Sequence, residues 1–218
     1  MKRAFLFCCV MSCMMMSCVK NTQQLEDIKS GDLLFVSVPA DYELLDSTKQ
    51  VVIDSTKEMN YIHAAILDVD ERGEIWISDA TLRHGVAHRP TDEFLKDYTL
   101  KDGSLPRFEV MRLKDNSKID KYMNNVKKYI GEQYDTDFLM NNGKHYCTEL
   151  IYDAYADEEG HVFDLKTVDF RDAHGNIPML WIQLFQKINI PLPDGMPGIM
   201  PQQMYDEGKL RKVNVKFP

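Results

Sequence analysis

Strand-like apolar segments dominate the first half of this chain and helical periodicity dominates the second half, and this order constrains the fold most strongly. Strands are predicted over residues 32–38, 62–69, 75–80 and 107–113. The second and third are separated only by a short polar stretch around Gly73, which is typical of a β-hairpin turn. Strands followed by helices predict a single α+β domain, which we place over residues 30–218.

Helical spacing of apolar residues appears later in the chain. Helices are expected over residues 119–130, 147–155, 178–188 and 201–207. Gly131 ends the first of them, and Cys147 stands at or next to the start of the second. The Gly- and Asp-rich stretch 157–177 is expected to be a loop, and whether it gates a cleft is open.

Three further expectations concern shorter stretches. Residues 85–89 are expected to form a short fourth strand, and residues 39–60 a loop with a short helix. A helix is predicted to start near Pro90, with Thr91 as its cap and acidic residues in its first turn.

The first 17 residues have the layout of a secretory signal, with a basic start followed by an uncharged apolar stretch. The stretch is too short to span a bilayer, which takes about 20 apolar residues. Its end resembles a bacterial lipobox, with Ser17 as the small residue before Cys18. We therefore expect residues 1–17 to be a lipoprotein-type signal peptide, Cys18 to carry a lipid anchor, and residues 18–29 to be a tether.

Two alternatives stay open for this end of the chain: an ordinary signal peptide cut elsewhere, and a buried N-terminal helix. Under the lipoprotein interpretation, the protein is exported and anchored to a bacterial membrane of the cell envelope. The formal net charge is −8 and no long Lys/Arg run is present, which argues against a nucleic-acid partner. We expect a small peptide or a cell-wall fragment as substrate.

Cys147 is the first candidate for chemistry. With Cys18 lipid-modified, Cys147 is the only thiol of the domain, so no internal disulfide is expected. A thiol at a helix N-terminus feels the positive end of the helix dipole, which favours the thiolate. The alternative is a small, inert core residue, because free cysteines are often buried.

His63 is the candidate base, since it is a polar residue near the head of an apolar strand. If the hairpin turn centres near residues 71–73, His63 lies roughly opposite residues 79–81, so Asp79 or Thr81 can contact it. A carboxylate there would fix the imidazole tautomer. The alternatives are a satisfied core histidine at position 63, turn chemistry for Asp79, and His145 as a rival base.

No metal or other cofactor is expected. The cysteines of the apolar N-terminal stretch do not have paired zinc spacing, and His84 and His88 have no carboxylate cluster around them. Glu149 follows Cys147 by two residues, and we interpret it as an ordinary helix-start acid that points elsewhere.

Five motifs occur in an order that resembles a known family. They are Gly31-Asp32-Leu33-Leu34-Phe35, the His63 strand, the Asp79-Ala80 strand, Gly131-Glu132-Gln133-Tyr134-Asp135 with Phe138, and Tyr146-Cys147-Thr148-Glu149-Leu150. Over residues 28–156 they resemble the permuted papain-like amidases of the YiiX/YaeF type, which are relatives of NlpC-type cell-wall peptidases and of lecithin:retinol acyltransferase.

This resemblance implies a circularly permuted papain-like fold, with an antiparallel sheet or partial barrel packed against helices. It implies that Cys147 is the nucleophile at a helix N-terminus, His63 the base and Asp79 the orienting group. The backbone N–H of Cys147 would belong to the oxyanion hole.

We therefore expect an exported thiol hydrolase that cleaves an amide bond in peptidoglycan stem peptides or related short peptides. Two alternatives remain. One is a lipid-directed acyl hydrolase or acyltransferase that uses the same Cys/His pair. The other is a non-catalytic module that binds cell-wall peptides.

Overall fold

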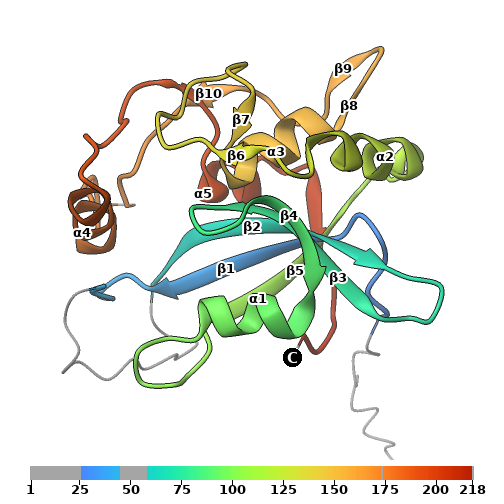
Figure 1. Cartoon of the computed structure of the whole chain (residues 1–218), viewed down its shortest axis with the longest axis horizontal. Coiled ribbons are helices and arrows are strands. Elements are labelled where there is room, and N and C mark those ends of the chain that lie inside the picture. Colours follow the sequence, from blue (N-terminus) through green and yellow to red (C-terminus); the bar gives the residue numbers. More distant parts are fainter. Residues whose placement is uncertain (1–25, 45–57, 173, 218) are drawn as a thin grey trace, which may run out of the picture.

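The computed structural model describes residues 26–44, 58–172 and 174–217 (Figure 1). The predicted signal peptide, the predicted lipid-anchor residue Cys18 and most of the predicted tether lie outside the described residues. So does most of the stretch 39–60, for which a loop with a short helix is predicted. The described part of that stretch includes the start of the second strand, at Met59.

A six-stranded antiparallel sheet forms the centre of the structure, with strand order β12-β5-β1-β2-β3-β4 (Figure 1). Its strands are β1 (Leu33–Pro39), β2 (Met59–Val69), β3 (Ile75–Thr81), β4 (Gly85–Pro90), β5 (Arg107–Leu113) and β12 (Leu210–Lys212). The strands predicted in the first half of the sequence are all present. The hairpin register also follows the prediction, because Ile66 faces Ser78 and Asp68 faces Trp76 across a turn centred on residue 72.

The central strands are apolar along their length because both faces of the sheet are covered. Leu33 and Phe35 point into one hydrophobic cluster, whereas Leu34 and Val36 point into another on the opposite face. Figure 1 shows the helices responsible: α1 (Thr91–Tyr98) covers one face, and α2 (Ile119–Tyr129), α3 (Cys147–Ala154) and α5 (Pro201–Asp206) cover the other.

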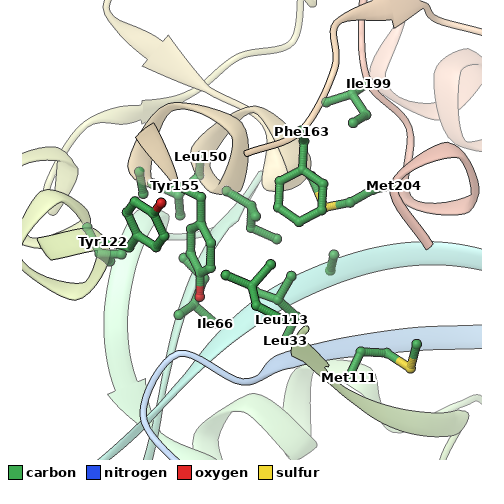
Figure 2. Packing of buried hydrophobic residues seen from close by; sticks show 14 of the residues in the cluster. Leu33, Ile66, Met111, Leu113, Tyr122, Leu150, Tyr155, Phe163, Ile199 and Met204 are labelled. Carbon is green, nitrogen blue, oxygen red and sulfur yellow. The ribbon is translucent and has the colours of Figure 1, made fainter. Parts of the chain in front are cut away.

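The cluster under α3 is the larger of the two. Figure 2 shows Leu150 and Tyr155 of this helix region packed toward Ile66 and Leu33 of the sheet, with Met204 of α5 at the side. The hydroxyl of Tyr155 donates a hydrogen bond to the Gly31 carbonyl at 2.9 Å. This packing fixes the helix that begins at Cys147 relative to the sheet.

The second half of the chain adds α4 (Met179–Ile188) and three pairs of two-residue strands among the described residues. The pairs are β6 (Gln133–Tyr134) with β7 (Lys144–His145), β8 (Ala156–Asp157) with β9 (Gly160–His161), and β10 (Lys166–Thr167) with β11 (Pro197–Gly198). The stretch 157–177, predicted to be a loop, therefore carries parts of two of these pairs.

One local prediction is wrong in its detail. Thr91 is the first residue of α1 and does not cap it; its hydroxyl donates instead to the Ile75 carbonyl at 2.7 Å. The Thr91 hydroxyl therefore bonds to strand β3 and not to the start of its own helix. Within the described residues, no helix has the length and apolar character needed to cross a membrane.

Candidate active site

Cys147 is the first residue of α3, and the helix start is organised by its neighbours. The backbone N–H of Tyr146 donates to Glu149 Oε2 at 3.3 Å, which forms a capping box. The sulphur of Cys147 accepts hydrogen bonds from the backbone N–H groups of Ala64 and Thr148. The thiol is 7% exposed and borders a cavity, so it is both shielded and reachable.

Both neighbours of Cys147 are tied to the C-terminal part of the chain. The hydroxyl of Tyr146 accepts a hydrogen bond from the backbone N–H of Ile199 at 3.1 Å. The hydroxyl of Thr148 donates to the carbonyl of the same residue. The position of the sulphur therefore depends on a segment about fifty residues further along the chain.

His63 lies on β2 beside a register irregularity of the β1–β2 pair. Val36 pairs with His63 and Ser37 pairs with Tyr61, so one residue of β2 is left over between them. Such a bulge turns side chains out of their regular direction, and bulges are common beside active sites. The imidazole packs against the ring of Tyr98 on α1, with 5.0 Å between ring centroids.

The two ring nitrogens of His63 have different partners. Nε2 lies 3.0 Å from Oδ2 of Asp79. A second side-chain hydrogen bond joins the ring to Cys147, which leaves Nδ1 as the nitrogen that faces the sulphur. The hairpin brings His63 to Asp79, and the start of α3 adds Cys147, so the three residues singled out in the sequence lie together.

The charges of Cys147, His63 and Asp79 stabilise one another. Burial raises the pKa of the Cys147 thiol, but the charge and hydrogen bond of His63 outweigh burial and lower it overall. Burial likewise lowers the pKa of His63, yet the Cys147 thiolate and the Asp79 carboxylate raise it to about 9. Each charge therefore favours the other, so this environment stabilises a thiolate beside an imidazolium.

Asp79 has a partner that sequence reasoning missed. Arg89 of β4 donates to it through Nε at 3.3 Å and Nη2 at 3.1 Å, and both side chains are buried. The signal was available in the strand pattern, because Arg89 faces Ile77 in the register and so shares a face with Asp79.

His145, the rival base, is held away from the thiol. Its Nδ1 lies 2.7 Å from Glu132 and its Nε2 lies 3.0 Å from Asp153. Both ring nitrogens are therefore occupied, and the structure contradicts His145 as the partner of Cys147. Burial lowers the pKa of His145, but Asp153 and other nearby carboxylates raise it overall.

Glu149 performs the predicted helix-start role through its bond to Tyr146, yet it does not point into solvent. Its side chain is fully buried, and Oε1 has no hydrogen-bond partner. Burial raises the pKa of Glu149 to about 8. The sequence does not reveal this, because the covering residues come from distant segments.

A cavity of about 440 Å³ lies beside Cys147 and His63. Most of its walls are apolar, and they include Ile62, Phe138, Leu180, Trp181, Leu184 and Met200. Three of these residues belong to α4, a helix that the sequence predicts without indicating its role. Arg83 and Asp97 supply charged groups at the cavity wall.

The family described as permuted papain-like amidase enzymes, YaeF/YiiX, C92 family, matches residues 27–214. The chain belongs to this family. The resemblance predicted from the sequence motifs is thereby confirmed, and it extends through the C-terminal segment. The family consists of papain-like cysteine amidases, so the chain is assigned to this class of enzyme.

A solved structure of this family type has the same fold. It is the metalloprotein YiiX from Escherichia coli O157:H7, with a TM-score of 0.59 and 18% sequence identity, covering 88% of this chain and 100% of that one. No curated protein matches the chain. In the described part of this chain, no three His, Cys, Asp or Glu side chains are grouped so that they could hold a metal ion.

Proposed function

We propose that this family member hydrolyses an amide bond with Cys147 as nucleophile, His63 as general acid and base, and Asp79 as the group that orients His63. The observation that carries the proposal is the position of His63. Its ring joins a buried thiol on one side to a buried carboxylate on the other, at the wall of a cavity. These are the parts that an activated thiol nucleophile needs.

The reaction begins with the Cys147 thiolate, which attacks the carbonyl carbon of the amide. The carbonyl oxygen becomes an oxyanion, and backbone N–H groups at the start of α3, including that of Cys147, stabilise it. His63 gives its proton to the leaving amine as the C–N bond breaks, which leaves a thioester on Cys147. Water then attacks the thioester while His63 accepts its proton, and the carboxylic acid is released as the thiolate reforms.

Short peptides from the cell wall are the first substrate class that we propose. The family's amidase activity and the signal-like N-terminal sequence support this class. In the same proposal the enzyme is exported and anchored through Cys18 to a bacterial membrane of the cell envelope. Its net charge of −8 suits an amine-bearing peptide.

The cavity supports a second candidate, a lipid-directed acyl hydrolase or acyltransferase with the same Cys/His pair. Trp181, Leu184 and Met200 provide an apolar wall beside the thiol. An acyl chain would bury its methylene groups there, each worth about 0.8 kcal/mol. In this reaction the same thioester forms, and the acyl group passes to water or to another acceptor.

One product assay separates these candidates. The intact protein is incubated with stem peptides, with N-palmitoyl amino acids and with phospholipid vesicles, and products are identified by mass spectrometry. Cleavage of stem peptides alone supports the peptide class, whereas release or transfer of fatty acid supports the acyl class. Cys147→Ala should abolish either activity while the circular dichroism spectrum stays unchanged. Binding of stem peptides without any turnover would overturn the proposed enzyme activity in favour of a non-catalytic module.

A further inference from the structure

A charged chain of contacts continues beyond the candidate triad, on the side of Asp79 that faces away from Cys147. Arg89 donates two hydrogen bonds to Asp79 and a third, through Nη1, to Asp97 of α1. The guanidinium also lies over the ring of Phe94, 5.5 Å from its centroid. Arg89 is 4% exposed, so its charge is little screened by solvent.

We propose that Arg89 is a positioning residue for catalysis, which balances the charge of Asp79 and holds its carboxylate toward His63. This inference rests on the proposed function and deepens it. Arg89 does not touch the reacting atoms; it acts through Asp79.

Arg89 balances the charge of the buried triad. The active form of the triad contains two buried anions, the Cys147 thiolate and Asp79, but only one cation of its own, His63. Arg89 supplies the second cation, and without it the buried group would carry a net negative charge. Such a charge is costly at low dielectric, and the group would relieve it by taking up a proton. The thiolate is the anion whose loss stops the reaction.

The other groups that face this cluster do not replace Arg89. Tyr98 of α1 and Tyr134 of β6 are near the thiolate, but burial raises the pKa of both phenols well above 10, so they stay neutral. Asp97 lies on the far side of Arg89, where Arg83 forms an ion pair with it and His84 contacts it. Tyr146 is neutral as well, because burial raises its pKa.

Arg112 is a matched control for Arg89, because its role is purely structural. Arg112 makes the same two-pronged contact with Asp32, at 2.6 and 2.7 Å, and both side chains are buried. That pair joins β5 to the start of β1, and neither residue borders the catalytic cavity. Removal of either arginine should reduce stability, but only removal of Arg89 should change the thiol.

The test measures the alkylation rate of Cys147 by iodoacetamide as a function of pH, in the intact chain, with the Cys147 peptide followed by mass spectrometry. In Arg89→Met, the pH at which the thiolate appears should move upward by about 1 unit relative to the wild type. In Arg112→Met it should stay at the wild-type position. In the double variant Asp79→Asn/Arg89→Met, which removes one charge of each sign, it should return toward the wild-type position.

If Arg89→Met does not fold, Asp79→Asn is compared with the double variant. The thiolate should then appear about 1 pH unit lower when Arg89 is present. An Arg89→Met profile that coincides with that of Arg112→Met, or a double variant shifted as far as Arg89→Met, overturns the role of Arg89. A wild-type thiol that titrates like a free cysteine, near pH 8.5, overturns the proposed function itself.

Discussion

The hydroxyl oxygen of Tyr146 lies only 2.6 Å from the point where a Cβ atom on Gly198 would stand. Cγ2 of Val168 lies at the same distance from that point, so residue 198 has no room for a side chain. The close approach lets the next residue, Ile199, donate its N–H to that hydroxyl. Gly198 thus controls the position of the residue that precedes Cys147.

Gly198→Ala is expected to push Tyr146 away and to displace the start of α3. We expect a loss of about 1–3 kcal/mol in the free energy of unfolding and slower alkylation of Cys147. Tyr146→Phe removes the clashing oxygen and leaves the contact with Val168, so the double variant should lose somewhat less than the sum of the two single losses. Chemical denaturation of the four proteins measures this coupling, and additive losses would contradict the steric explanation.

Thr148 offers a test of the second bond to Ile199. Thr148→Val leaves the buried carbonyl of Ile199 without its donor and should cost about 1–3 kcal/mol. Thr148→Ser keeps the hydroxyl and should retain most of the stability and the wild-type alkylation rate. If the Thr148→Val and Thr148→Ser variants had the same stability in urea denaturation, the hydroxyl would have no role in holding the helix.

The stability of the protein should depend on the proton of His63. Its pKa in the folded state is about 9, above the ordinary value of 6.5. The stabilisation is therefore complete below pH 6.5 and is lost as the pH rises through 9. The proton itself is followed by NMR, in which the ring resonances of His63 should titrate near pH 9 in the wild type. In Cys147→Ala the same resonances should titrate at a lower pH, because the thiolate contributes to the shift. An unchanged titration would contradict the ion pair.

Glu149 should also make the stability fall with rising pH, but for a different reason, because burial penalises its charged form. Its folded-state pKa of about 8 exceeds the ordinary 4.5, so stability falls as the pH rises from 4.5 to 8. Glu149→Gln should raise Tm at pH 8 by at least about 2–4 °C and change it little at pH 4. Glu132→Gln is the control, since Glu132 is partly exposed and bonded to His145. A Glu149→Gln protein no more stable at pH 8 than wild type would contradict the buried acid.

Local sequence patterns were enough to predict the elements that position the candidate triad. The hairpin of β2 and β3 has a short turn, so its register follows from residue counting, which left Asp79 or Thr81 as the contact of His63. In the structure the contact is with Asp79. The helix from Cys147 was equally visible, because a polar and aromatic segment gives way there to helical spacing.

What the sequence did not reveal depends on contacts between distant segments. Strand β12 has three residues, and it is a strand only because Leu210–Lys212 pairs with β5. The burial of Glu149 and the clamp of Arg89 on Asp79 likewise arise from the packing of separate elements. The two carboxylates beside His145 come from before and after it in the chain, so spacing alone left it open as a rival base.

The bonds from Tyr146 and Thr148 to Ile199 also affect the order of events during synthesis. A growing chain presents its N-terminal part first, so the candidate cysteine, histidine and aspartate all leave the ribosome before Ile199 does. Until that residue arrives, neither neighbour of Cys147 has its hydrogen-bond partner. A chain cut short before Ile199 would carry the whole triad in its sequence without a fixed nucleophile. Thiol chemistry is therefore delayed until Ile199 has been made.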